Sequence, residues 1–324
     1  MVGRLISAIA ILGSLGGSVF AQDIYPSRQV TLIVPYPPGN AADVSARLLA
    51  DRVAAELGKP FVVINRPGAT GTIGTASVAK AEPDGYTLLL TSTGPIAVVP
   101  WINKTLSYNV ERDLLPVVGI ARGPFALIAN KDVPVRNIAE FVAYVKANPG
   151  KTNYASYGVG NVNQLAMETM KQAAGLDIAH IPYPGTGPAQ ADLLGGRVQF
   201  LFDGLPAAAA RMKAGDVRVL AVSSLKRNAI APDLPTVAES GIPALANFDV
   251  QGWVGLFAPV GTPPAVIEII SRAFLKNISV LDKLVSDQGM ETFALNPEQF
   301  ASFVKTDSEK WRKTIVDAKI EMPN

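Results

Sequence analysis

The chain has 324 residues, of which 48% are hydrophobic and 17% are charged, a composition typical of a folded protein of two domains or one large one. Its 29 Lys and Arg residues and 27 Asp and Glu residues are scattered and leave a net charge of +2, which argues against a nucleic-acid-binding protein. The absence of cysteine excludes disulfides, thiolate metal sites and a cysteine nucleophile, and a zinc site or catalytic triad would depend on the single histidine, His180. We therefore expect neither a metal nor a cofactor.

Residues 1–21 have the pattern of a secretory signal peptide. Arg4 is the only charged residue, residues 5–19 are small or apolar, and Val19 and Ala21 stand at the third and first positions before Gln22. An anchoring helix is the alternative, but the uncharged run is shorter than the ~20 residues that span a bilayer, and it contains glycines. We expect cleavage after Ala21 and export of the remaining chain.

After the leader, short β-branched runs alternate with amphipathic stretches, which is typical of an α/β fold with parallel strands. The first block predicts strands at 30–35, 61–64, 86–90 and 114–120, and helices at 42–57 and 73–81. The second block predicts strands at 125–129, 153–156, 178–183, 198–202 and 217–222, and helices at 138–147, 164–174, 189–194 and 207–214. Residues 226–246 lack a clear period, and the chain ends with a strand at 253–258 and helices that begin at Pro264 and Pro297. Two successive blocks suggest two domains, with the last segment returning to the first; a plain tandem arrangement is the alternative.

Four loops between these elements share one design; they span residues 36–43, 91–94, 157–163 and 184–188. Each combines Gly or Pro with Ser, Thr or Asn at the start of a helix. Backbone N–H groups at a helix N-terminus bind carboxylate or phosphate without Lys or Arg, and ligands of open α/β sheets bind beyond the carboxyl ends of the strands. Two loops come from each block, which predicts a cleft between domains that closes on a small anion. The alternative is that these residues are ordinary caps and turns, a role that also suits Asp43 in the first loop.

Catalytic motifs are sparse, since the chain contains neither a G-x-S-x-G elbow nor a P-loop. His180 lies in an apolar strand, where we expect a structural role, and a secreted hydrolase that uses Ser92 or Ser156 with His180 is a remote alternative. Asp203 would either accept a hydrogen bond from a ligand or cap the next helix, and Trp253 would either stack on a ligand or pack in the core. We therefore expect a binding protein and not an enzyme.

Short motifs along the whole mature chain carry a resemblance to a known family. They are Tyr25-Pro26, Pro35-Tyr36-Pro37-Pro38-Gly39 with Asp43, Asn65-Arg66-Pro67-Gly68-Ala69, Pro83-Asp84-Gly85-Tyr86-Thr87, Ala147-Asn148-Pro149-Gly150-Lys151, Tyr154-Ala155-Ser156, His180-Ile181-Pro182-Tyr183, Asp192-Leu193-Leu194-Gly195-Gly196, Arg218-Val219-Leu220-Ala221-Val222, Pro232-Asp233-Leu234-Pro235-Thr236 and Ala258-Pro259-Val260-Gly261-Thr262-Pro263. In these motifs the chain resembles the extracytoplasmic substrate-binding proteins of tripartite tricarboxylate transporters, the Bordetella uptake gene family.

The resemblance implies a type II periplasmic-binding-protein fold, with two α/β domains that close on a ligand in the cleft between them. The first domain would contain residues 22–122 and 225–324, and the second residues 123–224. The resemblance also implies a ligand carboxylate held by backbone amides and ordered water at the first loop, with help from loops of the second domain. Carried over to this chain, the ligand-binding residues are Tyr36, Pro38, Gly39, Asn40, Ala41, Ala42, Thr91, Ser92, Thr93, Ser156, Gly158, Gly160, Asn161, Asn163, Tyr183, Gly185, Thr186 and Asp203.

Position 40 departs from the family pattern, which usually has a second Gly directly after Gly39. Asn tolerates a left-handed backbone, but its amide adds a polar group, so we expect Asn40 to alter which carboxylate is accepted.

The resemblance implies a periplasmic protein that captures a small organic carboxylate and delivers it to membrane permease subunits, and we expect a monomer. A sensory protein of the same fold, which presents its ligand to a membrane receptor, is the alternative.

Overall fold

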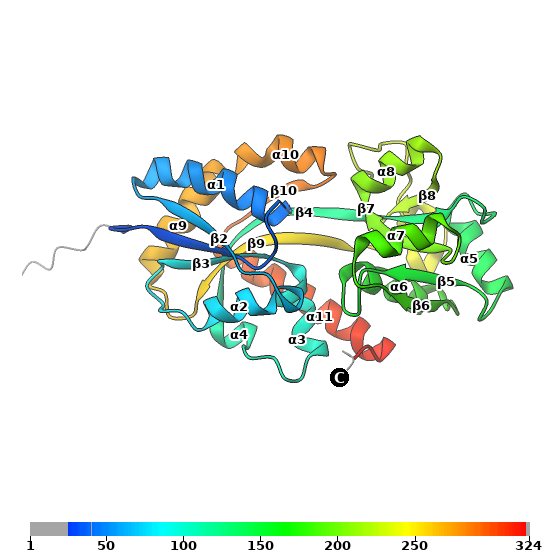
Figure 1. The fold of residues 1–324 in the computed structure, drawn as a ribbon, viewed down its shortest axis with the longest axis horizontal. Helices are drawn as coiled ribbons and strands as arrows, with labels where there is room; N and C mark the ends of the chain where they lie inside the picture. Colours follow the sequence, from blue (N-terminus) through cyan, green and yellow to red (C-terminus); the bar gives the residue numbers. More distant parts are fainter. Residues whose placement is uncertain (1–24, 40, 322–324) are drawn as a thin grey trace, which may run out of the picture.

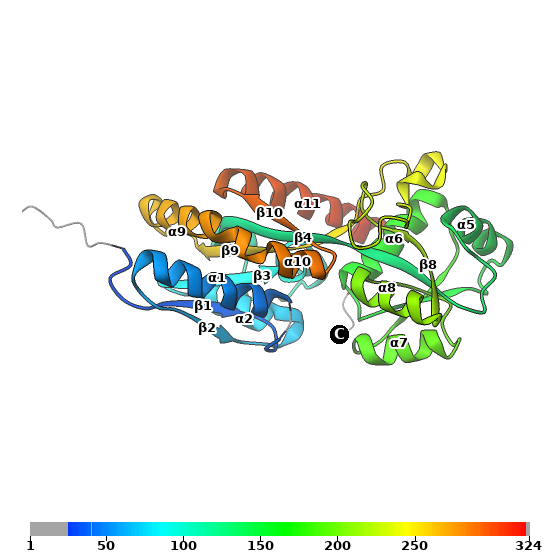
Figure 2. The same cartoon turned by 90° about the horizontal axis from the view of Figure 1, so that it is seen from above.

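The computed structural model describes residues 25–39 and 41–321, so the predicted signal peptide lies outside the described residues. Figures 1 and 2 show two lobes, which we term the first and second domains, joined by long strands. One path of strands connects them through β4 (Leu114–Asn130), in the order β2-β1-β3-β9-β4-β7-β5-β6, and β8 and β10 also pair with β4. This confirms the predicted two-domain α/β fold. Within the described residues, no helix has the length and apolar character needed to cross a membrane.

The first domain is built on three parallel strands, since β1 (Val30–Val34) pairs with β2 (Phe61–Asn65) and with β3 (Thr87–Ser92). β9 (Gln251–Pro259) and β10 (Glu291–Leu295) are antiparallel to their neighbours β3 and β4. The helical segments are α1 (Ala41–Leu57), η1 (Ala69–Gly71), α2 (Thr72–Ala79), η2 (Gly94–Val98), α3 (Val99–Ile102), α4 (Val110–Asp113), α9 (Pro264–Asn277), η5 (Ile278–Leu281), α10 (Asp282–Asp287) and α11 (Pro297–Ala318). Because β1 and β3 are parallel, the loops that follow them lie at one edge of the sheet, and the apolar face of α1 packs on β1.

The second domain repeats this design, with β5 (Asn153–Ser156) parallel to both β6 (Ala179–Pro182) and β7 (Phe200–Gly204). β8 (Val217–Val222) is antiparallel to β4. The helical segments are α5 (Ile138–Ala147), α6 (Val162–Ala174), α7 (Thr186–Leu194), α8 (Leu205–Ala214), η3 (Ala238–Ser240) and η4 (Pro243–Leu245). Since β5 and β7 are parallel, the loops that lead from them into α6 and α8 lie at the same edge of this sheet.

One predicted boundary is wrong. The strands expected at 114–120 and 125–129 are a single strand, β4, because neither Gly123 nor Pro124 ends it. Pro124 pairs with Gln251 of β9, and the fixed φ of proline is compatible with an extended backbone. Beyond this point β4 exchanges its partners β9 and β10 for β7 and β8, so the strand passes from one domain to the other near Gly123.

Residues 225–250 pack against the second domain before β9 returns to the first. Leu234 belongs to a core cluster of the second domain, and the rings of Phe202 and Phe248 stack with centroids 6.2 Å apart. Helix α11 also contacts the second domain, where the side chain of Gln172 on α6 donates a hydrogen bond to the carbonyl oxygen of Thr314 at 3.0 Å. The domain boundaries at 122/123 and 224/225 stay predictions, and these contacts favour a return crossing at β9.

Candidate functional site

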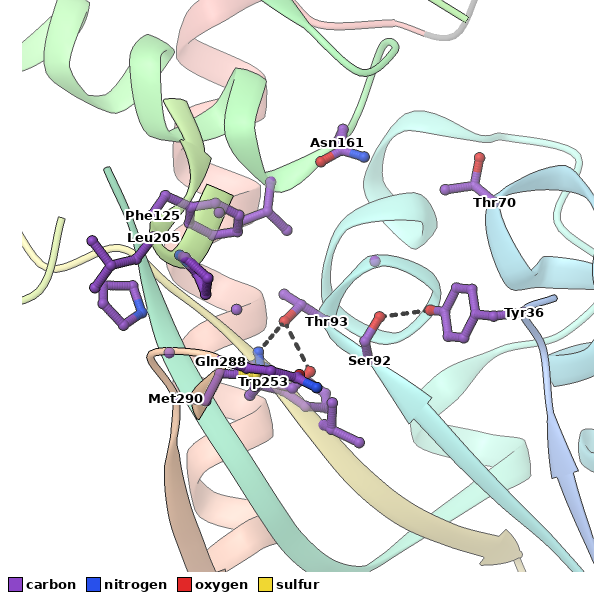
Figure 3. Close-up of a pocket in the computed structure, with 18 of the residues that line it drawn as sticks. Tyr36, Thr70, Ser92, Thr93, Phe125, Asn161, Leu205, Trp253, Gln288 and Met290 are labelled. Carbon is purple, nitrogen blue, oxygen red and sulfur yellow. Dashed lines mark hydrogen bonds between the residues drawn. The ribbon is translucent and has the colours of Figure 1, made fainter. Parts of the chain in front are cut away.

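A cavity of about 320 Å³, which we term the interdomain cavity, lies where the two domains meet. Figure 3 shows Tyr36, Ser92 and Thr93 of the first domain and, across the cavity, Asn161 and Leu205 of the second. The other lining residues are Thr70, Gly94, Gly123, Pro124, Phe125, Gly160, Val162, Gly204, Pro206, Gly252, Trp253, Val254, Gln288 and Met290.

The first-domain wall presents neutral hydroxyl groups. The hydroxyl oxygens of Tyr36 and Ser92 are 2.6 Å apart, and Oγ1 of Thr93 accepts a hydrogen bond from the backbone N–H of Trp253 at 2.9 Å (Figure 3). Burial raises the pKa of Tyr36, and hydrogen bonds with Ser92 and Thr91 offset only part of that effect, so the phenol stays protonated. Ser92 ends β3, and the sheet therefore fixes this row of hydroxyl groups at the cavity.

The second-domain wall is formed by the starts of α6 and α8. Asn161 is the N-cap of α6, and its side chain accepts a hydrogen bond from the backbone N–H of Asn163 at 3.3 Å. No side chain caps α8, which begins directly after Gly204. A helix N-terminus combines unpaired N–H groups with the positive end of the helix dipole. At α6 the N–H groups of Asn163 and Gln164 are already bonded to the side chains of Asn161 and Asn163, and at α8 Pro206 has no N–H. What the two helix starts share at the cavity is the positive end of the helix dipole.

The described residues that line the interdomain cavity include no charged side chain. The polar side chains are the hydroxyls of Thr70, Ser92 and Thr93 and the amides of Asn161 and Gln288, together with the phenol of Tyr36. Within the described part of the chain, no group of three or more His, Cys, Asp or Glu residues could hold a metal ion. Hydroxyl and amide donors beside the positive ends of helix dipoles suit a small anion, which they bind without an ion pair.

Asp43 holds the first loop, as its capping alternative predicts. Its carboxylate accepts hydrogen bonds from the backbone N–H of Gly39 and the side-chain amide of Asn65, both at 2.8 Å, and it pairs with Arg47 at 2.9 Å. Burial favours a higher pKa for Asp43, but the hydrogen bonds from Arg47, Gly39 and Asn65 outweigh it and lower the pKa. The carboxylate thus stabilises the loop from inside.

The structure brings some of the predicted ligand residues together at the interdomain cavity and places others elsewhere. Those that line it are Tyr36, Ser92, Thr93, Gly160 and Asn161. Those that the structure describes outside the lining are Pro38, Gly39, Ala42, Thr91, Ser156, Gly158, Asn163, Tyr183, Gly185, Thr186 and Asp203. Asn40 and the side chain of Ala41 lie outside what the structure describes. The assignment of these residues to ligand binding stays a prediction.

Asp203 lies behind the cavity wall and is bonded within its own domain. Its carboxylate accepts hydrogen bonds from the hydroxyl of Tyr157, from the side-chain amide of Gln190 at 2.8 Å and from the backbone N–H of Gly204 at 2.8 Å. Tyr183 is used in a similar way, since its hydroxyl donates to Asp192 at 2.6 Å. Both side chains therefore shape the loops that precede α7 and α8.

Ser156 and His180 lie side by side, as the hydrolase alternative requires, but not in a catalytic arrangement. The Oγ of Ser156 is 2.6 Å from Nε2 of His180, yet Ser156 is fully buried and does not line the interdomain cavity. The other ring nitrogen, Nδ1, faces the side-chain amide of Gln164 at 3.2 Å, where a triad needs a carboxylate. The pair therefore acts as a partly buried hydrogen-bonded contact between β5 and β6.

Several lining residues were not predicted from the sequence. Gly204, Leu205 and Pro206 have the same strand-to-helix design as the four recognised loops, so that pattern could have found them. Gln288 and Met290 follow α10 and carry no signal in the sequence. Trp253 lines the cavity but is 2% exposed, and its Nε1 donates to Asp307 at 2.7 Å, so it packs in the core as expected.

Comparisons with known proteins agree with this fold. A family model described as the tripartite tricarboxylate transporter family receptor, TctC, matches residues 45–320. The protein BugT of Bordetella pertussis is 36% identical over 314 residues, which cover 95% of this chain and 95% of BugT.

Solved structures give the same result. MatC from Rhodopseudomonas palustris, solved with bound malate, is 30% identical with a TM-score of 0.72 and covers 90% of this chain and 100% of its own. A second R. palustris protein, solved with adipate, is 32% identical with a TM-score of 0.77 and covers 92% of this chain and 99% of its own. The chain belongs to the TctC family of tripartite tricarboxylate transporter receptors, which are periplasmic solute-binding proteins.

Proposed function

We propose that this protein captures a small organic carboxylate in the interdomain cavity and delivers it to the membrane permease subunits of a tripartite tricarboxylate-type transporter. The observation that carries the proposal is a cavity between two domains whose described lining is uncharged, offers hydroxyl and amide side chains, and includes the starts of two helices. Such donors recognise a carboxylate by its charge and leave the carbon skeleton to the shape of the cavity. The relatives solved with malate and adipate support this ligand class.

Binding is coupled to closure of the two domains in this proposal. Donors come from both domains, and β4 and β9 connect the domains at the base of the cavity. A ligand that contacts both walls binds the closed form more tightly and shifts the equilibrium toward it.

The protein acts in the periplasm as a monomer after cleavage at Ala21, needs no cofactor and catalyses no reaction. A sensory protein of the same fold shares this binding step and differs in its membrane partner.

A thermal-shift screen of the protein from Gln22 onward tests the proposal. The panel contains mono-, di-, tricarboxylic and aromatic acids, with adipate and malate among them. A ligand at about 100 times its Kd stabilises the native state by roughly 2.7 kcal/mol, which raises the melting temperature visibly. A rise with at least one carboxylate is the expected result. A folded protein that responds only to neutral or cationic solutes contradicts the proposal.

A further inference from the structure

The orientation of the Gln164 side chain determines the tautomer of His180. The backbone N–H of Gly160 donates to Gln164 at 2.7 Å, so the atom that accepts this bond is the amide oxygen. The amide nitrogen therefore faces Nδ1 of His180 at 3.2 Å and donates to it. Because Nδ1 is an acceptor, the imidazole proton of the neutral ring is on Nε2.

The same chain of hydrogen bonds returns to the loop from which it started. With its proton on Nε2, His180 donates to Oγ of Ser156 at 2.6 Å. The hydroxyl of Ser156 in turn donates to the carbonyl oxygen of Gly158 at 3.2 Å. Gly158 and Gly160 are therefore tied to the two ends of one series of hydrogen bonds through Ser156, His180 and Gln164, which clamps the short segment 158–160 between them.

The clamped segment lies at the junction of the domains. Gly160 lines the interdomain cavity together with Asn161, and its backbone has a φ of +79°, which favours glycine. A Cβ at position 160 would lie 2.1 Å from Cδ1 of Ile102 and 4.0 Å from Cγ1 of Val98, both in the first domain. The conformation of this loop thus sets two things: the shape of the cavity wall at Gly160 and Asn161, and the contact of the second domain with Ile102 of the first.

The surroundings of His180 favour the neutral ring. The imidazole stacks on Tyr154 of β5, with centroids 4.9 Å apart. Tyr154 also contacts Lys171 and Glu168 of α6, which pair with each other at 3.0 Å. Burial first, and then the positive charge of Lys171, lower the pKa of His180 to about 4. A second proton on Nδ1 would place two donors face to face at Gln164 and break the series of hydrogen bonds.

We propose that His180 is a positioning residue for ligand binding, which as the neutral Nε2–H tautomer holds segment 158–160 in the conformation that forms the second-domain wall of the interdomain cavity. The link to a ligand rests on the proposed function, whereas the hydrogen-bonded clamp does not. His180 does not touch the cavity itself and acts through Ser156 and Gln164.

Nuclear magnetic resonance tests the clamp directly, because His180 is the single histidine of the chain and its ring signals need no assignment by mutation. We expect ¹⁵N shifts and two-bond couplings at pH 7 to show a proton on Nε2 and a bare Nδ1. We also expect the ring to stay neutral at pH 5.5. A proton on Nδ1, or titration near the ordinary histidine pKa of 6.5, would overturn the proposal.

Hydrogen exchange separates positioning from general stability. In Gln164→Met, the amide of Gly160 loses its acceptor, and we expect it to exchange at least tenfold faster than in the wild type. Gln199→Met is the matched control, since the Gln199 side chain also accepts a hydrogen bond from a backbone N–H, that of Asn153 at 2.8 Å, at the opposite end of β5 from segment 158–160. Equal acceleration of the Gly160 amide in both variants, or none in Gln164→Met, contradicts the clamp.

The consequence for binding is measured by calorimetry with adipate and malate as probes. We expect the Kd of the probe that binds the wild type to rise at least fivefold in Gln164→Met and to change less than twofold in Gln199→Met. An unchanged Kd in Gln164→Met overturns the positioning role in binding. If the wild type binds no carboxylate at all, the proposed function fails, and the resonance and exchange results still decide the clamp.

Discussion

At the scale of single residues, neutral side chains face the interdomain cavity, while charged side chains outside its lining form hydrogen bonds with the surrounding loops. Ser92, Thr93 and Asn161 line the cavity, whereas Asp43 and Asp203 accept hydrogen bonds from the loops that surround it. A carboxylate that faced the cavity would repel an anionic ligand, but one that binds loop N–H groups from inside stabilises the loop without that penalty. The two aspartates thus help to set the geometry of the loops around the cavity.

Asp43→Asn tests this supporting role. The change removes the charge that pairs with Arg47 and places an amide N–H₂ against donors from Gly39, Asn65 or Arg47. We expect a loss of about 1–3 kcal/mol in the free energy of unfolding, measured by urea denaturation. Asp51→Asn, at an exposed position of the same helix, is the control and should change stability by less than about 0.5 kcal/mol. Equal effects of the two substitutions would disprove the role of Asp43.

The pH dependence of stability reports the protonation of His180. Its pKa is lowered from 6.5 to about 4 in the native state, so between these values the unfolded chain binds the proton more readily. The contribution of the neutral ring is therefore complete above pH 6.5 and is lost as the pH falls toward 4. The carboxylates titrate in both the wild type and His180→Phe, so the difference in melting temperature between the two proteins isolates the contribution of His180. We expect this difference to shrink as the pH falls from 6.5 toward 4. A difference that stays constant from pH 7 to 4 contradicts this.

At the scale of secondary-structure elements, β4 and β9 carry the junction between the domains. Gly123 and Gly252 are partners in their register, and both line the interdomain cavity. Gly123 is tightly covered, since a Cβ there would lie 2.6 Å from Cγ and 3.0 Å from Cα of Met290. At Gly252 a Cβ would meet the ring of Phe125 at 3.4 Å, an ordinary contact.

Gly123→Ala should therefore displace Met290 and its backbone from the cavity wall. We expect a loss of about 1–3 kcal/mol in the free energy of unfolding, and weaker binding of adipate or malate. Gly252→Ala is the matched control on the neighbouring strand, with a smaller loss of stability. Denaturation and calorimetry measure both effects. If Gly252→Ala proves as harmful as Gly123→Ala, the close approach of Met290 is not the cause.

Much of the fold was predictable from periodicity in the sequence. The helix at 138–147 and the strands at 153–156 and 217–222 have the expected bounds, because each combines a clear apolar period with polar or glycine flanks. The continuity of β4 was not predictable, since Gly123-Pro124 usually signals a break and only the tertiary pairing with β9 keeps the backbone extended. β10 was missed because its alternation is short and half-exposed.

The candidate site was predictable only in part. Tyr36, Ser92, Thr93, Gly160 and Asn161 combine turn-forming backbone with polar side chains directly after strands, and they line the cavity. The loop at 183–187 has the same local chemistry but lies outside the lining, because which loop reaches the cavity depends on how the domains are placed. Local sequence carries no information about that placement.

At the scale of the whole molecule, the two domains are linked by more than the two crossing strands. Figures 1 and 2 show α11 running alongside β4 toward the second domain, and its Thr314 contacts Thr169 and Gln172 of α6. These contacts keep this side of the molecule together, so in the proposed closure the walls of the interdomain cavity would approach each other about an axis near α11. We expect a ligand to lower the radius of gyration in small-angle scattering, and an unchanged radius at saturation contradicts closure.

The central claim is that the interdomain cavity binds a carboxylate, and a crystal structure grown with the panel acid that stabilises the protein most tests it directly. The account predicts electron density for the acid between the two domains, with carboxylate oxygens within hydrogen-bond distance of groups at Ser92 and Thr93 or at the starts of α6 and α8. Density for the acid elsewhere on the protein, with the interdomain cavity holding only water, would contradict it.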